Sequence, residues 1–199
     1  MHLSLAPDKI PAALTTSFAP ETTRAWVDVD LAALAENARI VAAVSGRRLL
    51  PMVKANGYGL GAIEVARALE PLDPWGYGVA AVEEGRTLRT GGIGRPILVV
   101  SPLLAADAGR YLAHDLRPSI GDPAALAAWS AQSDRPFHVE VDTGMSRGGV
   151  RWDDAHALEA MRGALGTAVG WEGIYTHFHS AETDPPSVKV QWERFQSVL

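Results

Sequence analysis

Hydrophobic and polar residues alternate along this chain with two different periods. Stretches with apolar residues three and four positions apart, typical of amphipathic helices, are separated by short apolar runs, typical of strands. The expected strands are residues 24–30, 49–53, 75–80, 95–100, 116–120, 136–142 and 171–178. The expected helices are residues 31–44, 61–70, 81–92, 103–113, 122–132, 152–165 and 187–199.

Two of the expected helices carry recognisable end signals. Asp30 precedes the first helix, where its carboxylate can accept a backbone N–H of the first turn, and Gly46 follows that helix. Asp122 has the same capping position before a later helix, and Pro123 stands at its first residue, where no N–H is needed.

The order of the elements predicts the fold class. Strands that alternate with helices of this length form βαβ units and a parallel sheet, and six such units follow from residue 49 onward. The strand expected at 24–30 precedes them and can lie outside the sheet. Six units fit either an open, doubly wound sheet or most of an eight-stranded barrel.

Two observations favour the barrel. No Gly-x-Gly-x-x-Gly follows an early strand, which removes the main signal of a dinucleotide-binding sheet. Polar residues instead follow several different strands, as in a (β/α)8 barrel, whose site is built from the carboxyl ends of many strands. We therefore expect an α/β protein with an incomplete TIM-type barrel of about six βα units. The polar residues in question are Lys54, Asn56, Tyr58, Asp142, Thr143, Arg147, His177 and His179.

Composition narrows the class of protein further. The chain has 199 residues, 47% of them hydrophobic, which is enough for one domain with its own core. A net charge of -5 without a basic cluster argues against a nucleic-acid partner, and the absence of cysteine excludes disulfides, zinc–thiolate sites and thiol nucleophiles. Residues 1–23, interrupted by prolines, are expected to form an irregular arm. No stretch reaches membrane-spanning length, so a cytoplasmic protein without membrane contact is expected.

Lys54 ends an apolar run and is followed at once by Ala-Asn-Gly-Tyr-Gly. A lysine at the end of a strand is commonly a solvated loop residue whose ammonium reaches water. Gly57 and Gly59, however, free the backbone for unusual dihedral angles close to a ligand, and the hydroxyl of Tyr58 follows four residues after the amine. Desolvated at a barrel mouth, Lys54 would have a lowered pKa and could supply the free amine of Schiff-base chemistry.

Arg147 lies in the glycine-flanked segment Glu-Val-Asp-Thr-Gly-Met-Ser-Arg-Gly-Gly. It could pair with a surface carboxylate, or its guanidinium could bind a substrate carboxylate through two parallel hydrogen bonds. Glu140 precedes Asp142 by two residues and therefore shares its face of the strand. From there the Glu140 carboxylate is expected to orient Arg147.

His177 and His179 stand two residues apart in an expected strand and would share one face of it. Three roles are open for them. With Glu182 nearby they could form a metal site, although the sequence offers no further cluster of His and Asp residues placed to complete one. Alternatively, a histidine here is buried and satisfied by backbone groups, or its ring stacks on an aromatic cofactor.

Three ordered segments resemble the signatures of alanine racemases. Val-Lys-Ala-Asn-Gly-Tyr-Gly-Leu-Gly, which contains Lys54, is similar to their pyridoxal-phosphate lysine motif. Val-Asp-Thr-Gly-Met-Ser-Arg-Gly-Gly and Gly-Ile-Tyr-Thr-His-Phe are similar to the second and third signatures, and Trp-Val-Asp-Val-Asp-Leu-Ala-Ala-Leu-Ala-Glu-Asn fits the family's opening. The resemblance runs from about Arg24 to the end of the chain, and the three motifs together are highly specific.

The resemblance implies pyridoxal 5'-phosphate as the cofactor and alanine as the substrate. Lys54 would form the Schiff base with the cofactor and serve as the base on one face of the substrate α-carbon. Tyr58 would bind the cofactor phosphate, and Arg147 would assist the cofactor phenolic oxygen and the substrate carboxylate. His177 would lie against the pyridine ring. The cofactor would act as electron sink, and the product D-alanine would serve cell-wall synthesis.

The resemblance also implies parts that lie beyond Leu199. Residues 24–199 would be a partial pyridoxal-phosphate-binding barrel, without the last two barrel strands and without the family's C-terminal β-domain. In the family a tyrosine of that domain, from the partner subunit of a homodimer, is the second acid–base group. Little or no racemase activity is therefore expected of this chain alone.

Two positions depart from the family pattern. Leu60 stands where the family often has histidine, a position near the cofactor that carries no proton. Glu140 stands where many members have a lysine modified to a carbamate, which presents a negative group to the arginine of the next loop. We hypothesise that the Glu140 carboxylate replaces this carbamate.

Two other functions are open on the sequence alone. A non-catalytic pyridoxal-phosphate-binding barrel would carry the same Lys54 segment, although Asp-Thr-Gly-Met-Ser-Arg favours the racemase. A metal-dependent hydrolase would be built on His177 and His179.

Overall fold

A parallel sheet of six strands forms the centre of the computed structural model, which describes residues 27–199. The strands follow the order β1-β2-β3-β4-β5, and β6 also pairs with β4. The arm expected at residues 1–23 lies outside the described residues. The strands are β1 (Tyr77–Val79), β2 (Ile97–Pro102), β3 (Arg117–Ile120), β4 (Phe137–Asp142), β5 (Val150–Arg151) and β6 (Trp171–Thr176).

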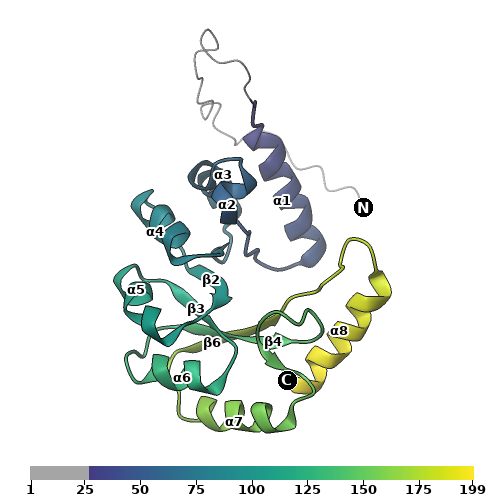
Figure 1. Ribbon diagram of the computed structural model, residues 1–199. Coiled ribbons are helices and arrows are strands. Elements are labelled where there is room, and N and C mark those ends of the chain that lie inside the picture. Colours follow the sequence, from purple (N-terminus) through teal and green to yellow (C-terminus); the bar gives the residue numbers. More distant parts are fainter. Residues whose placement is uncertain (1–26) are drawn as a thin grey trace.

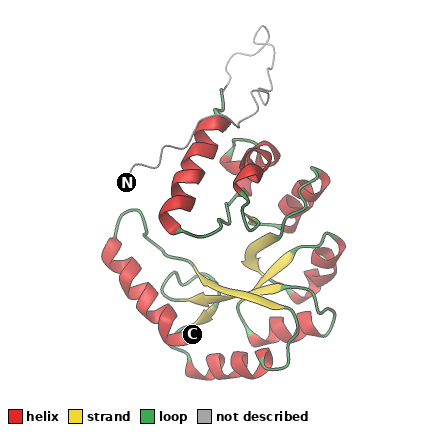
Figure 2. Cartoon of the chain, turned by 180° about the vertical axis from the view of Figure 1, so that it is seen from behind, coloured by secondary structure: helices red, strands yellow, loops and turns green. Residues whose placement is uncertain are grey.

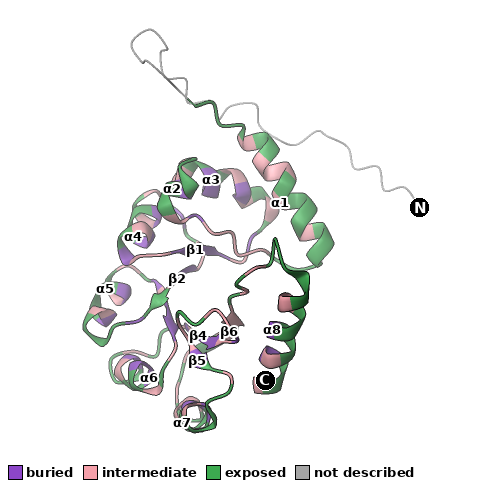
Figure 3. Ribbon diagram, turned by 45° about the vertical axis from the view of Figure 1, so that its right-hand side comes forward, coloured by how far each residue is buried: buried purple, intermediate pink, exposed green. Residues whose placement is uncertain are grey.

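The helices lie on the outside of the sheet. In Figures 1 and 3 they follow one another in an arc around the strands, with α1 and α8 at its two ends, and Figure 2 shows the strands inside this arc from behind. Parallel strands inside a ring of helices are the architecture of a (β/α) barrel, so the expectation of an incomplete barrel is confirmed. The helices are α1 (Leu31–Ser45), α2 (Lys54–Tyr58), α3 (Ala62–Leu69), α4 (Val82–Thr90), α5 (Ala108–Ala113), α6 (Pro123–Ser130), α7 (Ala155–Leu165) and α8 (Pro185–Val198), with short 3-10 turns at Glu70–Leu72 and Ala105–Asp107.

Side chains along each strand point alternately to the helices and to the barrel interior. On β4, Phe137, Val139 and Val141 are buried and belong to the main hydrophobic cluster. His138 and Glu140 alternate with them and therefore point to the interior. The hydrophobic core thus lies between sheet and helices, where Figure 3 shows the buried residues, and the interior carries polar groups.

A polar cluster fills the amino-terminal end of this interior. The Arg117 guanidinium donates to both oxygens of Glu172, at 2.6 and 3.3 Å, and His138 Nε2 lies 3.2 Å from the same carboxylate. Arg117 also lies over the ring of Trp75, 5.7 Å from its centroid. Because these polar groups form hydrogen bonds and ion pairs with one another, we assign this end of the barrel to stability. The candidate reactive groups lie at the carboxyl-terminal end.

The segment that precedes Lys54 forms less of a strand than expected. Only Met52 forms a bridge, with Gly78 of β1. The Val53 N–H donates to the Gly78 carbonyl and the Gly78 N–H donates to the Pro51 carbonyl, at 2.8 and 2.9 Å. Proline has no N–H, so the ladder cannot extend through Pro51. The other five strands expected from residue 75 onward are present as β1, β2, β3, β4 and β6, and the two-residue β5 was not predicted.

The prediction of a strand at 24–30 is wrong for residues 27–30, which form no strand. Residues 24–26 lie outside the described part of the chain. Val27 is 82% exposed, so the apolar side of the alternating pattern has no sheet to cover it. The end signals of α1 are confirmed: Asp30 accepts the Ala33 N–H at 2.9 Å, and Gly46 has φ 61°.

The start of α6 is also confirmed, because Asp122 accepts the Ala125 N–H at 2.8 Å and Pro123 is its first residue. None of the described helices is both long enough and apolar enough to cross a membrane.

Gly149, which precedes β5, provides a test of the packing at the end of β4. It has φ +97°, and a Cβ there would lie 2.8 Å from the Asp142 nitrogen and 2.9 Å from the Glu140 carbonyl oxygen. We predict that Gly149→Ala lowers the free energy of unfolding by roughly 2 kcal/mol or more, from strain and steric overlap together. Urea denaturation of the chain measures this.

The matched control for that variant is Gly163→Ala in α7. Nothing lies within 4 Å of a Cβ at Gly163, and its φ is helical. This substitution should stabilise the chain by about 0.5–1 kcal/mol, because glycine is a poor helix former. Equal stabilities of the two variants would contradict the close approach at Gly149.

Candidate active site

Lys54 begins a turn of left-handed backbone at the carboxyl side of the sheet. Ala55, Asn56, Gly57 and Tyr58 have φ values of 51°, 55°, 65° and 55°. The left-handed region is uncommon for residues other than glycine, and a run of four is costly unless other contacts hold it. The expectation of unusual dihedral angles after Lys54 is therefore confirmed, but they extend beyond the glycines.

Several hydrogen bonds hold this turn. The Gly57 N–H donates to the Val53 carbonyl at 2.8 Å, and the Asn56 side chain accepts the Ala62 N–H at the start of α3 at 3.0 Å. The Ala55 N–H donates to a carboxylate oxygen of Glu84, on α4, at 2.7 Å. The turn is thus tied to the strand segment before it and to both helices beside it.

The Lys54 side chain is half-buried, and its Nζ lies 5.9 Å from the centroid of the Tyr58 ring. Tyr58 itself is 62% exposed. The expected proximity of the amine and the aromatic residue is therefore present, with the Tyr58 hydroxyl on an accessible side chain.

The loop that carries Arg147 is fixed by the end of β4. The Asp142 carboxylate accepts the N–H groups of Gly144 and Ser146, both at 2.9 Å. Arg194 of α8 donates to the Thr143 carbonyl at 2.8 Å. These bonds hold the backbone up to residue 146, and Arg147 follows directly with an exposed side chain.

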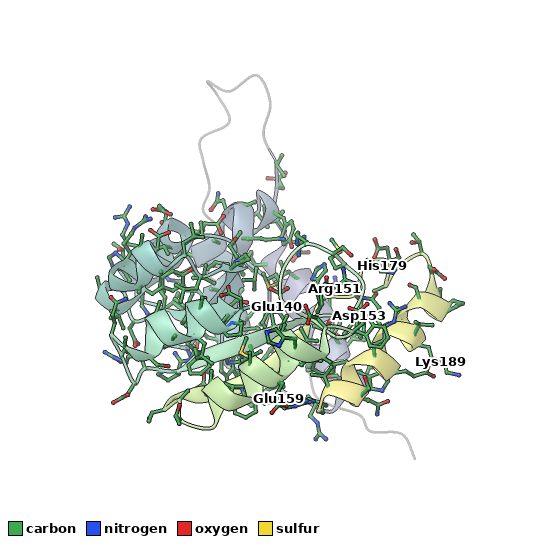
Figure 4. All side chains as sticks on the ribbon, turned by 60° about the horizontal axis from the view of Figure 1, so that its bottom comes forward. Glu140, Arg151, Asp153, Glu159, His179 and Lys189 are labelled. Carbon is green, nitrogen blue, oxygen red and sulfur yellow. The ribbon has the colours of Figure 1, made fainter. Side chains whose placement is uncertain are left out.

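Glu140 lies inside the barrel at the same level as Tyr175 of β6, its partner in the sheet register. It is 6% exposed, and Figure 4 shows it in the middle of the molecule. Ser119 of β3 donates to its carboxylate at 3.4 Å and lies 2.6 Å from the Tyr175 hydroxyl. Side chains from three neighbouring strands therefore meet in one polar layer.

Burial raises the pKa of Glu140, and the positive charge of Arg147, together with hydrogen bonds from Ser119 and Tyr175, opposes this rise. Arg147 is thus close enough to act on Glu140 through its charge. Among the ion pairs of residues 27–199, none joins the two side chains directly. Burial and the Glu140 charge also raise the pKa of Tyr175, which keeps its hydroxyl protonated.

His177 and His179 do not lie on a strand, contrary to the sequence prediction, because β6 ends at Thr176. Instead of a neighbouring strand, the buried side chain of Gln191 forms hydrogen bonds with the backbone of both histidines. It donates to the His177 carbonyl at 3.1 Å and accepts the His179 N–H at 3.0 Å. The His179 ring contacts the Ser180 hydroxyl at 2.7 Å. In residues 27–199 no three His, Asp or Glu side chains are grouped to hold a metal.

His177 is where the separate segments converge. Partial burial lowers its pKa below 6.5, and the positive charges of Arg147 and Lys54 lower it further. Three loops that are far apart in the sequence thus place these side chains within electrostatic range of one another. The lowered pKa favours the neutral imidazole, which can lie against an aromatic ring.

The site fits pyridoxal phosphate by the chemistry of its side chains. Lys54 offers an amine, Arg147 offers a guanidinium for an anionic group, and His177 offers a neutral planar ring. The buried carboxylate of Glu140 balances part of the positive charge. A ligand with an aldehyde, an aromatic ring and anionic groups matches this set.

Three residues of this region were not identified from the sequence: Glu84, Ser119 and Tyr175. Tyr175 could have been found, because it stands two residues before His177 in the motif Gly-Ile-Tyr-Thr-His-Phe. Ser119 and Glu84 give no signal of their own. Their partners are 21 and 29 positions away in the sequence, respectively.

A family model described as "Alanine racemase, N-terminal domain" matches residues 29–199. The chain belongs to this family. An alanine racemase of Symbiobacterium thermophilum is 38% identical over 181 residues, which cover 87% of this chain and 48% of that protein. The crystal structure of alanine racemase from E. faecalis is 33% identical and superimposes with a TM-score of 0.75, over 85% of this chain and 48% of that one.

The chain spans about half the length of the curated alanine racemases that it matches. Alanine racemases depend on pyridoxal phosphate and are isomerases. A histidine racemase from Leuconostoc mesenteroides has the same fold, with a TM-score of 0.73 at 21% identity over 83% of this chain and 46% of that one. The fold by itself therefore does not determine the amino acid that is racemised.

The buried carboxyl of Glu140 gives a pH-dependent prediction. Because its pKa is raised in the folded protein above the ordinary value of 4.5, its contribution to stability is fully present below pH 4.5 and is lost as the pH rises through the folded value. A neutral glutamine has no such loss. Glu140→Gln should therefore gain stability relative to the native chain between pH 4 and pH 8.

Urea denaturation of both proteins at the two pH values measures this difference. Glu159→Gln, on the exposed side of α7 (Figure 4), controls for the loss of one negative charge. A stability difference between Glu140→Gln and the native chain that is the same at pH 4 and pH 8 would contradict the burial of a charged group.

Proposed function

We propose that this chain is the cofactor-binding barrel portion of a pyridoxal-phosphate-dependent racemase that interconverts L- and D-alanine. The observation that carries the proposal is the convergence of Lys54, Arg147 and His177 at the carboxyl ends of the strands, in a chain of the alanine racemase family. The similarity to proteins named alanine racemase supports alanine as the substrate. The active protein is proposed to be a cytoplasmic homodimer, as the family implies.

Each side chain has a distinct task in this proposal. Lys54 would hold the cofactor aldehyde through its amine, and the same amine, once free again, would accept or return the α-proton on one face of the substrate. Tyr58, whose side chain is exposed, would hold the cofactor phosphate. Arg147 would hold the substrate carboxylate and assist the cofactor phenolic oxygen, and the ring of His177 would lie against the pyridine ring. When bound, the cofactor supplies an electron sink for the α-carbon.

Glu140, inside the barrel, is proposed to keep Arg147 in place. Its carboxylate is buried, and the Arg147 charge acts on its pKa. A permanent carboxylate at this position needs no modification with carbon dioxide, in contrast to the carbamate of many family members. This supports the hypothesis that Glu140 replaces the carbamate, with Ser119 fixing the carboxylate from the neighbouring strand.

The first test is reductive trapping of the cofactor. The chain has three lysines, Lys9, Lys54 and Lys189, so the labelled position is easily assigned. After incubation with pyridoxal phosphate and reduction with borohydride, mass spectrometry of the digest should find the phosphopyridoxyl group on Lys54 at low cofactor concentration, because a bound phosphate raises the local concentration of the aldehyde. Lys54→Ala should abolish this label.

Lys189 serves as the internal reference for random reaction. Its side chain is 79% exposed and points outward from α8 in Figure 4. Equal labelling of Lys54 and Lys189 at all cofactor concentrations would contradict a cofactor site at Lys54.

A second test separates a racemase from a non-catalytic cofactor-binding barrel. If Lys54 acts as a base on one face of the α-carbon, the chain with pyridoxal phosphate should exchange the α-hydrogen of one alanine enantiomer in deuterated water at least tenfold faster than that of the other. The factor of ten corresponds to about 1.4 kcal/mol. Proton NMR of the two enantiomers measures the exchange.

Free pyridoxal phosphate without protein, which is achiral, is the control and exchanges both enantiomers equally. The same equality in the presence of the chain, with Lys54 already labelled in the trapping test, would overturn the catalytic assignment and leave the non-catalytic one.

A further inference from the structure

Glu84 makes contacts that the proposed chemistry does not yet use. It stands at the third position of α4, and its side chain is half-buried. One carboxylate oxygen accepts the N–H of Ala55 at 2.7 Å, from the residue directly after Lys54. The other oxygen accepts the N–H groups of Ala80 and Ala81, at 2.7 and 3.2 Å. A single carboxylate thus joins the turn after Lys54 to the loop after β1.

The contact to Ala55 is made at a left-handed, non-glycine residue. Ala55 has φ 51° and ψ 45°, which costs an alanine roughly 1–2 kcal/mol relative to the right-handed region, and it has no polar side chain to compensate. In the part of the chain that the structure describes, no backbone carbonyl accepts its N–H. Glu84 therefore supplies the protein acceptor for this N–H.

The bond is short, at 2.7 Å, and its acceptor is a carboxylate oxygen, so it belongs to the stronger class of protein hydrogen bonds. The direction of the Lys54 side chain depends on it, because the turn that begins at Lys54 is stable only if the left-handed residues after it are held. Asn56 and Val53 fix the later part of the turn, at Ala62 and Gly57 respectively. Glu84 holds the residue that directly follows Lys54.

We propose that Glu84 is a positioning residue for Lys54: its carboxylate holds Ala55 in the left-handed conformation and thereby directs the Lys54 amine into the cofactor site. This inference rests on the proposed cofactor role of Lys54. The residue acts through the backbone and touches neither cofactor nor substrate.

The variant Glu84→Gln distinguishes the roles of the two carboxylate oxygens. Glutamine at the third position of a helix still caps the preceding N–H groups through its carbonyl oxygen. It cannot also accept from Ala55, because its second terminal group is an amino group and a donor. The variant therefore keeps the start of α4 and loses the contact to the turn.

Two readouts follow. In the cofactor-free chain, exchange of the Ala55 amide hydrogen, measured by NMR, should become roughly tenfold to a hundredfold faster in Glu84→Gln. With pyridoxal phosphate, the visible Schiff-base absorbance and the labelling of Lys54 should require at least tenfold more cofactor. Glu83→Gln is the matched control, because Glu83 neighbours Glu84 on α4 but pairs with Arg110 on the surface.

A rescue variant distinguishes positioning from a general loss of stability. Ala55→Gly removes the cost of the left-handed conformation, so in the Glu84→Gln background it should restore most of the cofactor affinity. Unchanged labelling and exchange in Glu84→Gln, or no rescue by Ala55→Gly in a folded double variant, would overturn the inference.

The outcomes also separate this inference from the proposed function. If the native chain itself shows no Lys54 label, the cofactor role fails, and Ala55 exchange in the cofactor-free chain still decides whether Glu84 holds the turn. If Lys54 is labelled equally well in the native chain and in Glu84→Gln, the cofactor role stands and the positioning role of Glu84 falls.

Discussion

The alternation of side chains along β4 is the constraint on which the site depends. Phe137, Val139 and Val141 must face the helices, because their burial there forms the centre of the hydrophobic core. His138 and Glu140, which alternate with them, must then face the barrel interior. A one-residue shift of register would turn the valines into the polar interior and move Glu140 out of it, so the same hydrophobic contacts that stabilise the fold determine the position of the charge.

This constraint has a cost at Glu140. Placing a carboxylate inside the barrel removes water from it, and the raised pKa reflects that loss. Ser119 and Tyr175 recover part of it through hydrogen bonds, and Arg147 recovers part through its charge. An interior glutamine would be easier to bury. Under the proposed function this buried carboxylate serves Arg147, in line with the clustering of perturbed pKa values at functional sites.

Much of the fold could be predicted from the sequence because its signals are local. The caps at Asp30 and Asp122 depend on neighbouring residues, and the strands β1, β2, β3, β4 and β6 follow short periodic patterns. The failures concern strand pairing, which the local pattern alone does not determine. Residues 27–30 show an alternating pattern, but the structure pairs them with no strand. The segment before Lys54 has a partner in β1, and Pro51 limits the pairing to one bridge.

The candidate site follows the same division. Lys54, Arg147 and His177 stand in recognisable motifs, as do Asn56 and Asp142, which hold two of their loops. Glu84 and Ser119 stand outside these motifs. Glu84 looks like an ordinary acidic residue in the first turn of a helix, and only the folded chain brings it to the Ala55 N–H. Left-handed residues occur in two of the three segments of the site, at Ala55–Tyr58 and at Ser146. Because each of them disfavours its own loop, the reactive side chains are held by contacts from neighbouring elements, and the loops alone would not place them.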